Sequence, residues 1–147
     1  MIAYVDSSVL ARAYLGDEDG SAEARRLLAD PDVGKVTGPW TRIEVSAAIV
    51  RAARSGRRVI RARALAELDA DLEHEGRVAV LSAPTEQLEE RALELARTHG
   101  LRALDALHVA LASIAIPPLV EGGEPLGFAS RDGDQAAVAA SLGFERV

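Results

Sequence analysis

Four acidic residues stand where a carboxylate can take part in chemistry. Three lie at predicted strand-to-helix transitions and one interrupts the most apolar helical segment; they are Asp6, Glu44, Asp105 and Asp132. In a parallel sheet all four can converge on one end, where clustered carboxylates repel one another unless a hard divalent cation with oxygen ligands holds them. Magnesium retains waters, which suits activation of a water nucleophile and stabilisation of charge on a phosphodiester.

Each of these residues also has a structural explanation. An aspartate directly after a strand, such as Asp6, is a good helix N-cap. The segment Thr41–Glu44 has the sequence of a capping box, in which the glutamate side chain closes on the helix start. Asp105 can stabilise the first turn of a helix through the helix dipole, although a buried carboxylate also requires a partner, a cation or a proton. Asp132 can begin an Asp-rich turn, and Asp134 competes with it for any functional role.

Other catalytic signatures are absent from the sequence. The chain has no cysteine, which excludes disulfides, thiolate metal sites and cysteine nucleophiles. It contains no glycine-rich dinucleotide fingerprint, no P-loop, no nucleophile elbow and no paired-histidine zinc motif. The three histidines are scattered along the chain, at His74, His99 and His108. We interpret His108, one turn after Asp105, as a hydrogen-bonded core histidine.

The composition predicts one globular domain over residues 1–147. A chain of this length with 48% hydrophobic residues can bury a core. The apolar segment Ala103–Val120 is interrupted by polar residues and prolines, so no run approaches the roughly 18 apolar residues of a membrane span. The first residues also lack the basic start of a signal peptide. We therefore expect a soluble, cytoplasmic protein with no membrane partner.

The charge distribution permits a nucleic-acid substrate without predicting a general nucleic-acid coat. The formal net charge is −6, whereas a protein that coats nucleic acid by broad phosphate neutralisation should be basic. One short segment is nevertheless rich in arginine, and its candidates for contact with an RNA backbone are Arg51, Arg54, Arg57 and Arg58. The alternative is a solvated helical hairpin, in which arginines pair with the acidic residues that follow them.

Strand-like and helical patterns alternate along the chain. The predicted strands are Ile2–Val5, Lys35–Thr37, Arg77–Leu81, Leu126–Ser130 and Phe144–Val147. The predicted helices are Ser7–Leu15, Ser21–Ala29, Thr41–Ser55, Val59–Glu75, Thr85–Thr98, Ala103–Ile116 and Gln135–Ser141, and Pro117–Pro125 is a loop. This alternation predicts an α/β fold with a mainly parallel sheet and helices on both faces. In such sheets the functional site lies beyond the carboxyl ends of the strands.

Four segments, taken in order, carry a resemblance to a known family. They are Tyr4–Ser8, Thr41–Val45, Leu101–His108 and Ala129–Asp132, and they extend over essentially the whole chain. With these segments the sequence resembles the PIN-domain ribonucleases, specifically the VapC-like toxins of type II toxin–antitoxin systems. The resemblance implies a three-layer α/β/α sandwich with a mainly parallel central sheet. It also implies an endoribonuclease site that uses magnesium, with manganese as a substitute.

The resemblance assigns roles to individual residues. Asp6, Glu44 and Asp105 match the core acidic residues of the family, and Asp132 matches a fourth, more variable one. These four are expected to be both catalytic residues and metal ligands. The hydroxyl residues expected to support them are Ser7, Ser8 and Ser130, the last in place of the usual threonine. The family further implies an RNA substrate, a homodimer, and a small cognate antitoxin whose tail occupies the acidic groove.

Two other functions are compatible with a small acidic α/β fold. A receiver-like phosphoacceptor domain also binds magnesium, but it needs a lysine late in the chain, and the only lysine is Lys35. A catalytically inactive PIN scaffold that binds RNA or protein is the second alternative. The presence of all four acidic residues argues against that loss of activity.

Overall fold

A parallel five-stranded sheet forms the centre of the structure. The computed structural model describes residues 1–57 and 59–147. The strands are β1 (Ile2–Val5), β2 (Gly34–Thr37), β3 (Val78–Val80), β4 (Leu126–Ala129) and β5 (Glu145–Arg146). They lie in the order β3-β2-β1-β4-β5, and each neighbouring pair is parallel.

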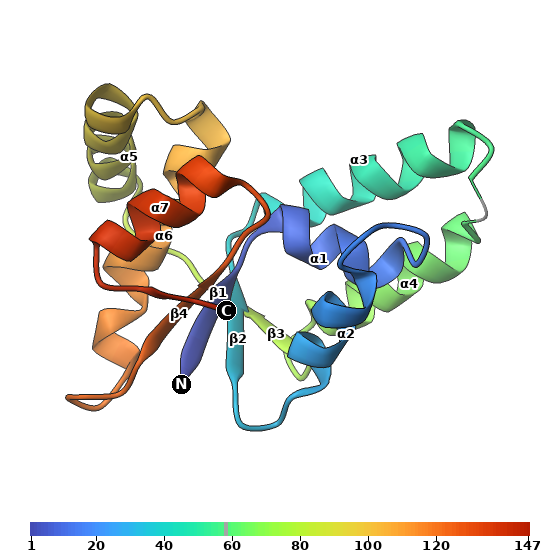
Figure 1. Ribbon diagram of the computed structural model, residues 1–147, viewed down its shortest axis with the longest axis horizontal. Helices are drawn as coiled ribbons and strands as arrows, with labels where there is room; N and C mark the ends of the chain where they lie inside the picture. The colour runs from blue at the N-terminus through green and yellow to red at the C-terminus, as the bar shows by residue number, and fades with distance from the viewer. Residues whose placement is uncertain (58) are drawn as a thin grey trace.

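Helices cover both faces of this sheet (Figure 1). The helices on one side are α1 (Ser7–Tyr14), α2 (Ser21–Ala29), α3 (Thr41–Arg54) and α4 (Arg61–Asp71). Those on the other are α5 (Thr85–His99), α6 (Ala103–Ala115) and α7 (Gly133–Ser141), with a short 3-10 turn at Pro117–Leu119 after α6. None of the helices in the two described ranges combines the length and apolar character that crossing a bilayer requires. The predicted α/β sandwich with a parallel central sheet is confirmed.

Successive residues of β1 face opposite helical layers because side chains alternate along a strand. Val5 packs in the apolar cluster with α1 to α4, whereas Tyr4 packs in the cluster with α5, α6 and α7. Both side chains are fully buried. Since β1 has a parallel neighbour on each side, the residue that follows it, Asp6, lies at the middle of the sheet edge.

One predicted helix is shorter in the structure. The pattern over Val59–Glu75 predicts a helix, but α4 ends at Asp71. The Asp71 carboxylate accepts two hydrogen bonds from Arg77, both at 2.6 Å, and one from the Tyr14 hydroxyl at 2.7 Å. The chain turns back tightly here, since a Cβ at Gly76 would lie 2.3 Å from the Asp71 carbonyl oxygen. This turn ends the helix before the apolar pattern does.

The strand order reverses at β1. The chain continues from β1 to β2 and β3 on one side, and then returns through α5 and α6 to place β4 on the other side of β1. Such a switch point opens a crevice outside the carboxyl ends of the two strands. Asp6 follows β1 directly and Ser130 follows β4 directly. The topology therefore places both residues at this crevice.

Candidate active site

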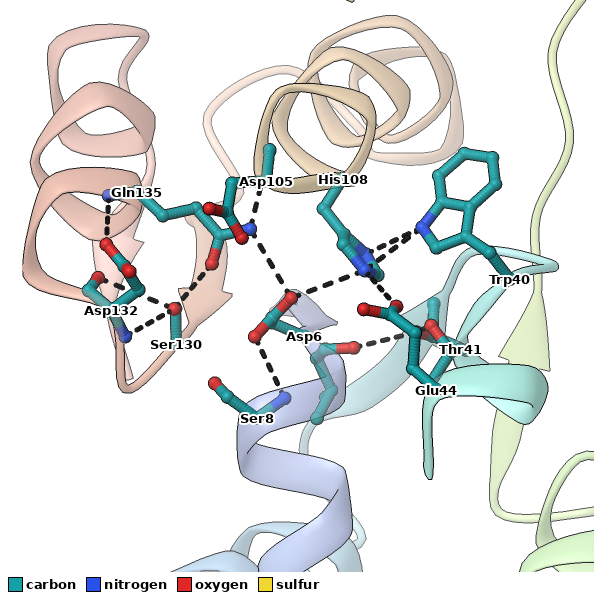
Figure 2. A network of polar contacts seen from close by, with 12 residues as sticks. Asp6, Ser8, Trp40, Thr41, Glu44, Asp105, His108, Ser130, Asp132 and Gln135 are labelled. Atoms are coloured by element: carbon teal, nitrogen blue, oxygen red, sulfur yellow. Dashed lines mark hydrogen bonds and ion pairs between the residues drawn. The ribbon is translucent and has the colours of Figure 1, made fainter. Parts of the chain in front are cut away.

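Asp6 lies at the centre of the candidate site (Figure 2). Its backbone N–H donates to the Ala129 carbonyl at 2.9 Å, and only 4% of the residue is exposed. Its Oδ2 accepts the backbone N–H of Ser8 at 2.9 Å, so it caps α1 as the sequence predicts. Its Oδ1 lies 3.3 Å from Gln135 Nε2 and 3.4 Å from His108 Nε2. One carboxylate therefore has a capping oxygen and a second oxygen directed into the site.

Gln135 connects β4 and the start of α7 to Asp6 and α6. Its side chain is fully buried, and its Nε2 lies 3.3 Å from Asp6 Oδ1 and 3.4 Å from the Asp105 carbonyl oxygen. Its Oε1 accepts the Ser130 hydroxyl at 2.5 Å, and Ser130 Oγ accepts the Asp132 backbone N–H at 3.0 Å. Ser130, expected as a supporting hydroxyl, is thus part of a hydrogen-bonded chain from Asp132 to Asp6.

Arg102 bridges two of the predicted acidic residues. Its Nε lies 3.1 Å from Asp105 Oδ2, and its Nη2 lies 3.0 Å from Asp132 Oδ2. The other oxygen of Asp132 accepts the backbone N–H groups of Asp134 and Gln135, both at 3.0 Å, and so caps α7. Of the two aspartates in this turn, Asp132 joins the network through its carboxylate, while Asp134 contributes a backbone N–H.

The acidic side chains act on one another electrostatically. Burial raises the pKa of Asp105, the charges of Asp132 and Asp6 raise that pKa further, and Arg102 opposes them. The pKa of Asp132 is instead lowered, chiefly by the backbone N–H of Gln135 and also by Arg102. Asp105 therefore lies within electrostatic reach of two other predicted acidic residues.

The first turn of α6 is more exposed than its composition predicts. The sequence favours a helix buried nearly all round, but the Asp105 side chain is 22% exposed and Leu104 is exposed. Full burial begins at Ala106 and includes His108. The fully buried part of α6 therefore begins after its first three residues.

Glu44 does not close a capping box, so that structural explanation is wrong. The N-cap position of α3 is Trp40, without a side-chain cap, and Thr41 already lies within the helix. The Thr41 hydroxyl hydrogen-bonds the Thr37 hydroxyl at 2.8 Å instead. The Glu44 side chain extends to His108, with 2.8 Å between Glu44 Oε2 and His108 Nε2 (Figure 2). Its carboxylate thereby points into the site.

A groove of about 360 Å³ lies between α1 and α3 and opens at the site. Ser7, Ser8 and Glu44 line it together with Arg51. Glu44 and Arg51 are seven residues apart on α3, which puts them on one face and about 10 Å apart along the axis. Ser8 Oγ also accepts the Arg131 backbone N–H at 3.0 Å, which ties α1 to the loop after β4.

The arginines predicted to contact RNA are Arg51, Arg54, Arg57 and Arg58. Arg51 lines the groove, and Arg54 lies exposed in the last turn of α3. Arg57 is paired with Asp17 and with Glu18, whose carboxylate lies 2.9 Å from its Nη1. These pairs hold the loop after α1 against the end of α3, so Arg57 has a structural role. Arg58 lies outside the described residues.

The donor set suits a hard divalent cation, because Asp6, Glu44, Asp105 and Asp132 supply only carboxylate oxygens from neighbouring elements. As the side chains stand, no three His, Asp or Glu residues within 1–57 and 59–147 are grouped so that they could hold one metal ion. Arg102 occupies an oxygen of Asp105 and one of Asp132, so a cation that uses these oxygens must displace it. Binding a cation requires some of these contacts to rearrange.

Sequence reasoning did not single out Gln135, Arg102 or Tyr4 as parts of the site. The structure places Tyr4 there as well, with its hydroxyl 2.8 Å from His108 Nδ1. Gln135 carried a weak signal, since it is a large polar residue in an otherwise alanine-rich helix. Tyr4 carried another, as the polar-tipped residue of an apolar strand. Arg102 carried no such signal, because arginines are common at exposed positions just before a helix.

Comparison with known protein families agrees with the fold. A family model described as "PIN domain" matches residues 3–141. Proteins of this family are generally nucleases, and they usually use divalent metals. No curated protein matches the chain.

Proposed function

The chain belongs to the PIN domain family, and from this we propose that it is a metal-dependent endoribonuclease. The reaction is hydrolysis of an RNA phosphodiester with magnesium, for which manganese can substitute. The observation that carries the proposal is that shared contacts link the four carboxylates at the sheet edge: Arg102 bridges Asp105 and Asp132, and His108 Nε2 faces both Glu44 and Asp6. Because the chain belongs to this family, we no longer consider the receiver-like phosphoacceptor domain.

We assign the metal to Asp6, Glu44, Asp105 and Asp132. A bound ion would stabilise charge on the phosphodiester and activate water as the nucleophile. The chain's own residues prepare the site by fixing these carboxylates: the buried Gln135 holds Asp6 Oδ1, and the backbone N–H groups at the start of α7 hold Asp132.

We propose that the groove between α1 and α3 receives the RNA strand beside the cleaved bond. Ser7 and Ser8 supply hydroxyls at the site, and Arg51 supplies a cation two helical turns from Glu44. Phosphate contacts of this kind position a strand without reading its sequence. The net charge of −6 favours such local contacts over broad phosphate neutralisation.

We further propose that the protein is the toxin of a type II toxin–antitoxin system and acts as a homodimer, with a cognate antitoxin protein as its inhibitor. The support is the order of the four segments that resemble VapC-like toxins, which ends at Asp132. We also propose that residues 1–147 form one PIN-like domain. Light scattering tests the dimer, and an antitoxin encoded in an adjacent reading frame should form a complex with the chain and suppress its activity.

The direct test of the activity is cleavage of total RNA with magnesium, with manganese, or with excess EDTA, followed by mapping of the new ends. We expect cleavage with either metal, none with EDTA, and none by the Asp105→Asn variant. Full activity in excess EDTA contradicts the metal requirement. A folded wild-type chain that binds RNA but cleaves none with either metal supports the inactive scaffold instead.

A further inference from the structure

His108 contacts two of the predicted metal ligands from a buried position. The residue is 1% exposed and lies on α6, one turn after Asp105. Its Nε2 is 2.8 Å from Glu44 Oε2 and 3.4 Å from Asp6 Oδ1 (Figure 2). A polar side chain this deeply buried must satisfy its hydrogen-bonding groups within the protein. Its contacts therefore define what the ring does.

The hydrogen-bond partners of the His108 ring determine which of its two nitrogens carries the proton. The Tyr4 hydroxyl lies 2.8 Å from Nδ1, and a phenol hydroxyl can donate its proton to an unprotonated ring nitrogen. Nε2 faces a carboxylate oxygen of Glu44, which accepts a hydrogen bond. Nε2 must therefore carry the proton of the Nε2–Glu44 bond. By occupying Nδ1, Tyr4 favours this arrangement.

Trp40 holds the face of the same ring. Its indole Nε1 lies 3.1 Å from His108 Nδ1 and 3.0 Å from Nε2, and the two ring planes are inclined by 77°. One N–H cannot point along two diverging in-plane lone pairs, so at equal distances it points at the imidazole face. Trp40 thus fixes the orientation of the His108 ring and leaves the in-plane lone pairs and N–H groups of the ring to Tyr4 and Glu44.

Gly38 leaves space for Tyr4 and Trp40 to pack against His108. A Cβ at this position would lie 2.7 Å from the Tyr4 hydroxyl oxygen and 2.9 Å from two carbons of the Trp40 indole. The segment after β2 can therefore pass close enough for both side chains to reach His108. The ring is held on one edge and on one face, and its remaining polar edge is directed at Glu44 and Asp6.

We propose that His108 is a positioning residue that donates its Nε2–H to Glu44 and so fixes this carboxylate for a divalent cation. This inference rests on the proposed function, because it concerns the same metal site. Glu44 is at the start of a helix, without a capping contact, and its carboxylate is partly exposed. Hydrogen bonds to ligating carboxylates orient them, and loss of such an outer partner typically weakens metal binding or activity by about 10–100-fold.

The test compares two substitutions that differ in the donor they retain. His108→Gln keeps an N–H donor near the position of Nε2, whereas His108→Leu removes it. Because His108→Leu also leaves the Tyr4 hydroxyl without its partner, it is combined with Tyr4→Phe. His99→Gln is the matched control, since it removes an exposed imidazole at the end of α5. Circular dichroism confirms that each variant is folded.

The first readout is the affinity of the full chain for Mn²⁺ alone, measured by calorimetry. We expect Tyr4→Phe/His108→Leu to bind Mn²⁺ about 10–100-fold more weakly than wild type. We expect His108→Gln to recover most of this loss and His99→Gln to match wild type. Equal Mn²⁺ affinity of wild type and the double variant overturns the positioning role. Wild type that binds no Mn²⁺ overturns the proposed function itself, which is a different result.

The second readout needs neither metal nor a variant. Imidazole ¹⁵N resonances of the metal-free wild-type chain show directly whether His108 Nε2 carries a proton. We expect a protonated Nε2. A neutral ring with the proton on Nδ1 and a bare Nε2 overturns the proposal, whatever the variants show, because such a ring cannot donate to Glu44.

Discussion

Removing Arg102 should strengthen binding of the metal ion. The guanidinium occupies one oxygen of Asp105, at 3.1 Å, and one of Asp132, at 3.0 Å, so a cation that uses these oxygens must displace it. The Arg102 side chain is 81% exposed. Solvent screens exposed ion pairs of this kind, so each changes a binding constant by at most about fivefold. The two pairs together therefore weaken metal binding by at most about 30-fold.

This upper limit sets the largest gain in Mn²⁺ affinity that we expect when Arg102 is removed. Arg102→Gln should therefore bind Mn²⁺ up to about 30-fold more tightly than wild type. The gain should shrink as salt is added, because exposed charges are screened. In EDTA the variant should melt below wild type, since two neighbouring carboxylates lose their shared cation.

The assay is calorimetric titration with Mn²⁺ at low and at high salt. Arg63→Gln is the matched control, because Arg63 forms an exposed pair with Glu67 at 2.8 Å and its loss changes the net charge equally. An Arg102→Gln variant that binds Mn²⁺ no more tightly than Arg63→Gln would refute the competition between Arg102 and the metal.

Three further substitutions test other parts of the site. Asp105→Asn should melt no lower than wild type in EDTA and should lose RNA cleavage. Burial raises the pKa of Asp105, so ionisation of this residue lowers the stability of the fold as the pH rises. Asparagine does not ionise and therefore removes this cost. A clear fall in melting temperature with cleavage retained would make it a structural residue. Glu44→Gln should change stability by no more than about 1 kcal/mol, since no capping contact is lost, and should abolish cleavage; near wild-type cleavage would remove Glu44 from the ligand set. Gly38→Ala should destabilise the fold by about 1–3 kcal/mol in urea titrations, because the added methyl meets Tyr4 and Trp40, and unchanged stability would show that both side chains can yield.

The fold and the individual strand ends were accessible from the sequence, because they depend on local patterns. The apolar run Ile2–Val5 is followed by an aspartate, and the structure shows that Asp6 caps α1. Asp132 likewise caps α7. Both caps join residues that are close in the sequence, so they can be predicted from the sequence alone. Alternation of strands and helices then predicted a parallel sheet, and its parallel strands place Asp6 and Ser130 at one edge.

The hydrogen-bonded connections between these ends were not accessible, because they join distant residues. Gln135 and Asp6 are 129 positions apart, and their contact depends on the pairing of β1 with β4 and on the packing of α7. The capping box at Glu44 was predicted wrongly for a related reason. A tertiary partner, Thr37, takes the Thr41 hydroxyl, and the helix starts one residue earlier than the motif requires.

The central claim is that Asp6, Glu44, Asp105 and Asp132 hold a divalent cation at the carboxyl edge of the sheet. Anomalous diffraction from Mn²⁺-containing crystals tests it most directly. We predict an anomalous peak coordinated by oxygens of Asp6 and of at least two of the other three carboxylates, with Arg102 withdrawn from Asp105. Crystals in which Mn²⁺ binds only elsewhere, at a concentration that supports RNA cleavage, would contradict the account.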